Sequence, residues 1–193
     1  MSEAPRILAF AGSIRRDSLN AALLRRAARA CEAAGGAVTL LPREALAIPL
    51  YDGDSEREDG LPAAARRLKR SIGEHDALLI AAPEYNGSLA PALKNALDWA
   101  SRREGDEAAS AAYSGKVAAM VAASPGRLGG ARGLMALRQV LSTLGVHVIP
   151  QQLALAEANK AFDETGELID DGHRKMLARI AEALVRTAAR LKS

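Results

Sequence analysis

Residues 6–20 read RILAFAGSIRRDSLN, and their order sets the class of fold. The apolar run at residues 6–11 ends in a glycine and a serine, which is typical of a buried strand that leads into a loop. Asp17 or Ser18 can then cap a helix, and Gly35-Gly36 is a typical helix end. This unit of strand, loop and helix recurs along the chain.

The alternation of apolar strands and helices continues to the C-terminal end. We expect strands at 6–11, 37–41, 76–82, 117–123 and 146–149, and helices at 18–34, 61–72, 90–102, 131–144 and 171–191. Residues 42–60 have no clear period and are expected to be a loop, and residues 151–167 are hard to assign. Continuous apolar strands between helices predict a parallel sheet covered on both faces. The expected fold class is α/β, with five parallel strands in one domain over residues 1–193.

Composition narrows the class of protein. With 193 residues, of which 49% are hydrophobic, the chain suits one globular domain. It has no run of 18 apolar residues and no start typical of a secretory signal, so we expect no membrane partner. The single cysteine, Cys31, fits a reducing compartment, and we expect it to lie buried on the first helix. These observations predict a cytoplasmic protein.

The net charge of +3 permits an anionic ligand but does not indicate a nucleic-acid site. Aromatic residues make up only 3% of the chain, too few for a platform on which several bases stack. We therefore expect no nucleic-acid partner.

Three loops follow the first, third and fourth strands, where ligands bind in sheets of this kind. The first spans residues 12–20 and opens a helix, whose unpaired N–H groups suit a phosphate. Ser13, Ser18 and Asn20 add neutral donors and Arg15 adds charge. The loop lacks both G-x-G-x-x-G and G-K-[ST]. It therefore favours a terminal monophosphate, and an ordinary helix cap is the alternative.

The second and third loops suit a flat ligand. In the second, Pro83-Glu84-Tyr85-Asn86, backbone amides and the Asn86 side chain can bond a planar heterocycle that Tyr85 shields. The third spans residues 124–130, and its glycines let the backbone approach a ligand closely. Taken singly, each loop can also be an ordinary turn.

Two motifs resemble signatures of the NADPH-dependent FMN reductase family. The first is GSIRRDSLN at residues 12–20, and the second is PEYNGS at residues 83–88 followed by PALKNALDW at residues 91–99. The similarity extends from Arg6 to about Ile149. It implies a flavodoxin-like three-layer sandwich, FMN as cofactor and NADPH or NADH as co-substrate. The family includes chromate, quinone and azo-dye reductases, and its members are commonly dimers or tetramers.

The resemblance also implies roles for individual residues. Those that would hold the FMN phosphate are Ser13, Arg15, Ser18 and Asn20. Those that would line the isoalloxazine, partly through their backbone, are Pro83, Glu84, Tyr85 and Asn86. Ser124 and Gly126 would close the pocket on the other side.

We expect the protein to be an FMN-dependent oxidoreductase. It would take hydride from NAD(P)H onto FMN and pass electrons to a quinone, flavin, metal oxyanion or azo acceptor by a ping-pong mechanism. The cofactor carries this chemistry, so we expect no catalytic side chain and no metal. His75, His147 and His173 lie outside the three loops and have no metal-ligand spacing. A flavodoxin-type electron carrier and a flavin-sensing module remain the alternatives.

The helix expected at residues 90–102 bears on assembly. Lys94, Asn95, Asp98 and Arg102 form one polar stripe, and an apolar arc fills the rest. This arc is wider than one sheet face requires. We therefore expect a homodimer or homotetramer, with a covering loop as the alternative.

Overall fold

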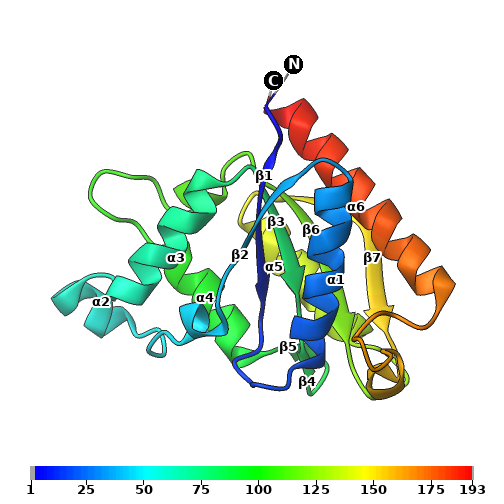
Figure 1. Ribbon diagram of the computed structural model, residues 1–193. Coiled ribbons are helices and arrows are strands. Elements are labelled where there is room, and N and C mark those ends of the chain that lie inside the picture. The colour runs from blue at the N-terminus through cyan, green and yellow to red at the C-terminus, as the bar shows by residue number, and fades with distance from the viewer. Residues whose placement is uncertain (1–2, 193) are drawn as a thin grey trace.

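The computed structural model describes residues 3–192 of the chain. Its main sheet has the order β2-β1-β3-β6-β7, and every neighbouring pair is parallel (Figure 1). The five strands are β1 (Arg6–Ala11), β2 (Ala37–Leu40), β3 (Ala77–Ala81), β6 (Val117–Ala123) and β7 (His147–Leu155). Counted along the main sheet, this is the 2-1-3-4-5 order of the doubly wound flavodoxin fold. The predicted fold class is confirmed.

Helices cover both faces of the sheet (Figure 1). One face packs against α1 (Leu19–Ala33) and α6 (Asp171–Leu191), and the other against α3 (Ala63–Glu74), α4 (Pro91–Ala100) and α5 (Ala131–Thr143). Strand β1 shows why the strands read as continuous apolar runs. Ile7 and Ala9 belong to the first core, and Leu8 and Phe10 to the second. Side chains alternate between the faces of a strand, so both sets must be apolar when both faces are buried.

The loop expected at residues 42–60 is wrong in part, because it contains η1 (Arg43–Leu46) and α2 (Gly53–Asp59). Helix α2 buries none of its residues, so it leaves no apolar period in the sequence. It is stabilised at its start instead. Asp52 accepts hydrogen bonds from the N–H groups of Asp54 and Ser55 at 2.7 and 3.1 Å. The acidic cluster is therefore mostly a capped, exposed helix rather than a loop.

The fifth strand is longer than the expected 146–149, because β7 continues through Pro150 to Leu155. Its register to β6 shifts between Ala118 and Met120. Strand β7 lies at the edge of the sheet, where a proline without an N–H group is tolerated at a bulge. Because Pro150 suggests the end of a strand, the sequence did not predict that β7 continues into the segment at 151–167. This segment also contains η3 (Ala158–Lys160).

The chain itself covers part of α4. The Asn95 amide accepts a hydrogen bond from Tyr51 N–H at 2.8 Å and donates to the carbonyls of Ile48 and Pro49. The Trp99 indole N–H donates to Pro49 at 2.8 Å. Asn95 and Trp99 in the second motif thus hold the segment at 48–51, and the covering-loop alternative accounts for this side of the helix.

Within residues 3–192, no helix is both long and apolar enough to cross a membrane.

Candidate functional site

The loops that follow β1, β3 and β6 meet at the carboxyl edge of the sheet and enclose a cleft of about 260 Å³. Thirteen residues line it: Ser13, Arg15, Asp17, Ser18, Leu19, Asn20, Pro83, Glu84, Tyr85, Ala123, Ser124, Pro125 and Asn159. The structure thus brings together all the predicted site residues except Asn86 and Gly126, each of which lies beside a lining residue.

The first loop is held close to the sheet. Gly12 donates its N–H to the Ala81 carbonyl at 2.8 Å. A Cβ at Gly12 would lie 2.8 Å from the Cβ of Leu93, so only glycine fits there. Ser18 then caps α1 by accepting a hydrogen bond from Ala21 N–H at 3.3 Å. The helix therefore begins at the cleft, with its first N–H groups unpaired by the helix itself.

Two residues of this loop differ in how far their side chains are engaged. Asn20 is buried, and its amide both donates to and accepts from the backbone of Ala123, at 2.9 and 3.0 Å. It joins the start of α1 to the end of β6. Arg15 is exposed at the cleft, and its guanidinium makes no hydrogen bond or ion pair to any residue within 3–192.

The second loop is a small hairpin that was not predicted. Strands β4 (Glu84–Tyr85) and β5 (Ser88–Leu89) pair antiparallel, and Asn86 and Gly87 turn between them with φ values of 52° and 83°. Asn-Gly favours a two-residue turn with both φ values positive, so this signal was present in the sequence. The turn leaves Tyr85 47% exposed at the cleft.

Glu84 points away from solvent and into α5. Its side chain is 8% exposed, and its carboxylate accepts hydrogen bonds from the Arg132 Nε at 2.8 Å and the Gly133 N–H at 3.1 Å. Burial alone would raise the pKa of Glu84, but these bonds and the charge of Arg132 outweigh it and lower the pKa. Glu84 is therefore held as a carboxylate.

The third loop is tied to the end of β7. Ser124 donates its N–H to Leu155 at 3.1 Å, and its carbonyl accepts from Ala158 N–H at 3.0 Å. The Ser124 hydroxyl accepts from Gly126 N–H at 3.2 Å. The bond from Ala158, the first residue of η3, brings η3 and Asn159 to the cleft.

Five lining residues were not predicted: Asp17, Leu19, Ala123, Pro125 and Asn159. The first four stand beside predicted residues, so their positions in the loops were a usable signal. Asn159 comes from the segment that could not be assigned. Only the path of β7 and η3 brings it to the cleft, and no sequence pattern marks that path.

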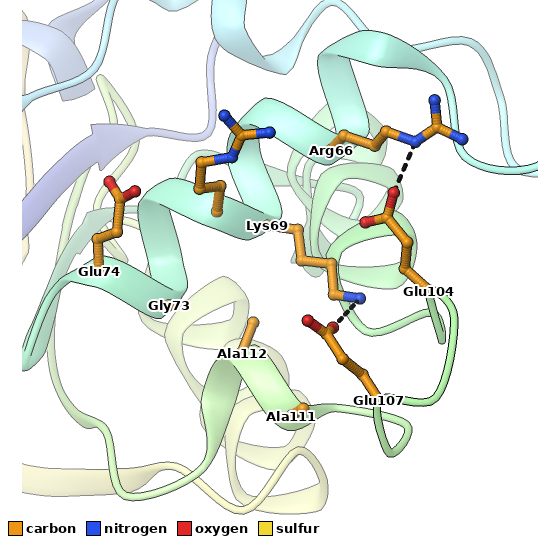
Figure 2. A pocket seen from close by; sticks show the side chains of 9 residues that line it. Arg66, Lys69, Gly73, Glu74, Glu104, Glu107, Ala111 and Ala112 are labelled. Atoms are coloured by element: carbon orange, nitrogen blue, oxygen red, sulfur yellow. Dashed lines mark ion pairs between the residues drawn. The ribbon is translucent and has the colours of Figure 1, made fainter.

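A larger cavity of about 510 Å³ lies elsewhere, between α3 and the segment at 104–112 (Figure 2). Figure 2 shows Lys69 pointing to Glu107 and Arg66 to Glu104, each ion pair at 2.7 Å. Its lining contains three basic side chains and three carboxylates, so its charges balance. Gly73 and Glu74 end α3 just before β3 begins, which places that end of the cavity toward the amino ends of the strands. Its composition favours no ligand class, in contrast to the cleft.

None of the three histidines lines the cleft. The His75 Nδ1 lies 2.6 Å from the Ser71 carbonyl, and His173 lies beside Asp170. Cys31 is fully buried, and this burial raises the pKa of its thiol to about 12. Within residues 3–192, no group of three His, Cys, Asp or Glu side chains is arranged to hold a metal ion.

Comparison with known proteins agrees with this geometry. The sequence model of the NADPH-dependent FMN reductase family matches residues 5–160. The chain is 39% identical to an NAD(P)H-dependent FMN reductase of Pseudomonas aeruginosa, over all of both chains. It is 37% identical to a quinone reductase of Escherichia coli, with 89% of each chain covered.

A solved structure is also similar. It is FerB, a flavoenzyme NAD(P)H:(acceptor) oxidoreductase of Paracoccus denitrificans, with a TM-score of 0.80 and 29% identity, covering 96% of this chain and 98% of that one. The motifs, the strand order and these matches agree, so the chain belongs to the NADPH-dependent FMN reductase family of flavin-dependent oxidoreductases.

Proposed function

We propose that the protein is an FMN-dependent reductase that oxidises NADPH or NADH and reduces a quinone, flavin, metal oxyanion or azo compound. The observation that carries this proposal is that the start of α1, Arg15 and the residues Pro83–Tyr85 line one cleft, and that the Arg15 guanidinium has no partner within residues 3–192. A helix N-terminus, serine hydroxyls and one arginine suit a monophosphate.

The residues at the cleft fit FMN in two parts. For the phosphate, Arg15 supplies charge, Ser18 caps the start of α1, and Ser13 lines the same cleft. Asn20 supports this loop from behind, since its amide bonds Ala123. For the flavin ring, Pro83 to Tyr85 offer backbone groups and an aromatic side chain, with Ser124 on the far side and Asn86 and Gly126 adjoining.

When bound, FMN supplies the redox chemistry by accepting a hydride from the nicotinamide and returning electrons to the acceptor. The protein's task is to orient the ring and admit two substrates. Among the described residues that line the cleft, no histidine stands ready to move a proton. We propose that nicotinamide and acceptor enter the same cleft in turn, which gives ping-pong kinetics.

A flavodoxin-type carrier uses the same fold and cofactor, but it does not turn over NAD(P)H. The net charge of +3 favours the enzyme, because an anionic dinucleotide is attracted to a cationic protein. Anaerobic mixing with NADPH separates the two proposals, since only the enzyme bleaches its flavin rapidly.

Steady-state kinetics test the reductase directly. NADPH and NADH are each combined with a panel of quinone, flavin, ferric, chromate and azo acceptors, and initial rates are plotted in double-reciprocal form. Parallel lines are expected, and intersecting lines would point to a ternary complex.

Replacing His75, His147 or His173 by Gln should leave kcat within about threefold of the wild-type value, a change of less than ~1 kcal/mol in the activation barrier. A protein that neither carries nor binds flavin would end the proposal. Residence in the cytoplasm stays a prediction.

A further inference from the structure

Helix α5 begins without a cap of its own. Its N-cap is Gly130, which has no side chain and a φ of 93°, and its first turn holds no acidic residue. That turn instead carries Arg132, whose charge opposes the positive end of the helix dipole. The start of α5 therefore needs an acceptor and a negative charge from elsewhere.

Glu84 supplies both from the neighbouring loop. One carboxylate oxygen accepts from Gly133 N–H at 3.1 Å, and the other from Arg132. The glycine at 133 permits this approach, because a Cβ there would lie 3.1 Å from the Cβ of Glu84. The carboxylate is thus a cap for α5 that comes from β4.

This contact joins two walls of the cleft. Glu84 is the first residue of the hairpin that carries Tyr85, and α5 is the helix that follows the third loop. The start of α5 is packed on the sheet, since a Cβ at Gly130 would lie 2.7 Å from the Cβ of Ala122. A carboxylate bound to α5 therefore fixes the hairpin relative to β6.

We propose that Glu84 is a positioning residue, whose carboxylate holds the hairpin to Arg132 and Gly133 so that the backbone beside Tyr85 stays in place for the flavin ring. This rests on the proposed function, in which the hairpin meets the ring. Asn86 and Gly87 adopt the positive φ values that a two-residue Asn-Gly turn favours, so the carboxylate is needed to set the position of the hairpin and not the shape of its turn. Glu84 acts through Arg132 and Gly133 rather than on the ring.

Titration of the intact protein with FMN and with riboflavin tests this, using quenching of flavin fluorescence. Riboflavin has the ring but no phosphate, so it reports ring binding alone. Glu84→Gln keeps the size of the side chain but removes its charge. We expect it to weaken both flavins by about tenfold, which is the loss of one hydrogen bond to a charged group. It should also change the shape of the visible absorption band of bound flavin.

Four further variants complete the experiment. Arg132→Met should weaken both flavins by at least about threefold, and the double variant should be no worse than Glu84→Gln alone. Arg15→Ala should weaken FMN but not riboflavin. Asp98→Asn is the matched control, because it breaks an exposed ion pair to Lys94 at 2.8 Å that lies away from the cleft.

The outcomes separate the two proposals. If the wild-type protein binds neither flavin, the proposed function fails. If it binds both, and Glu84→Gln matches Asp98→Asn in affinity and spectrum, the positioning role is overturned. Should Glu84→Gln not fold, Arg132→Met decides alone, and unchanged affinity for both flavins overturns the role.

Discussion

Arg15 and Arg16 are neighbours in sequence, and both are exposed, but only Arg15 lines the cleft. They are therefore a matched pair for the phosphate site. Arg15→Ala should weaken FMN binding by about tenfold or more, because a charge-assisted hydrogen bond contributes on the order of 1.5–3 kcal/mol. Arg16→Ala removes the same charge from the same loop and should leave the dissociation constant within about twofold. Equal losses in the two variants would contradict the assignment and indicate only a general effect of net charge.

Single residues of the cleft were predictable where a motif contained them. The sequence could place Ser13, Arg15 and Ser18 beside a helix start because strand and helix patterns flank them. It could not show that Asn20 turns inward to bond Ala123, because that bond spans 103 positions of the chain. Pairings of this kind depend on the sheet order, which no local pattern encodes.

At the scale of elements, the third loop depends on one glycine. Gly129 has a φ of 61°, and a Cβ there would lie 2.6 Å from the Ala154 backbone. Gly129→Ala therefore adds a backbone collision to the cost of a left-handed alanine, which is about 1–2 kcal/mol. We expect it to lower the free energy of unfolding by more than ~3 kcal/mol, measured by urea denaturation.

Gly105 supplies the control, since its φ is 59° and nothing lies within 4 Å of a Cβ built there. Gly105→Ala should cost about 1–2 kcal/mol, which is the conformational part alone. A loss in Gly129→Ala no larger than in Gly105→Ala would show that the third loop can shift away from β7.

Elements were predictable where they bury an apolar face. The five strands were predictable because both of their faces are buried, which gives continuous apolar runs. Helix α6 matches its expected range of 171–191, and six of its residues are buried. Helix α2 was missed because it buries nothing. The end of β7 was missed because Pro150 suggests an end, although an edge strand accommodates it.

At the scale of the whole molecule, assembly stays a prediction. The segment at 48–51 covers part of α4, so the apolar arc of that helix no longer argues for a partner. The exposed apolar side chains around the cleft argue for a partner instead. Tyr85 is 47% exposed there, and Ile14 and Leu128, in the first and third loops, are 52% and 55% exposed. We propose a homodimer or homotetramer. Light scattering on a sizing column at micromolar concentration should give at least a dimer, and a monomer would refute it.

The two ends of the described chain meet beside the amino end of β3 (Figure 1). Asp76 accepts a hydrogen bond from Arg6 N–H at 2.7 Å and from the Lys192 ammonium at 3.1 Å. Lys192 also reaches Glu3 at 3.4 Å. Asp76 thereby joins β1, β3 and the residue after α6. We propose that residues 1–193 form one domain that unfolds as a unit.

The pH dependence of stability tests this junction. Burial alone would raise the pKa of Asp76, but the bonds from Arg6 and Lys192 lower it below the usual aspartate value. A carboxyl whose pKa is lower in the folded state stabilises the fold above its unfolded pKa, about 3.9, and this stability disappears as pH falls through the folded pKa. At pH 7, Asp76→Asn should therefore lower the free energy of unfolding by on the order of 1–2 kcal/mol. The difference in the free energy of unfolding between wild type and variant should shrink below about pH 4. Urea denaturation at each pH measures this difference, and each curve should show a single transition.

Asp106→Asn is the control, because Asp106 is exposed and makes no ion pair within residues 3–192. A gap that stays constant from pH 7 to pH 2 would show that the Asp76 charge does not hold the ends together, and two separate transitions would contradict the single domain.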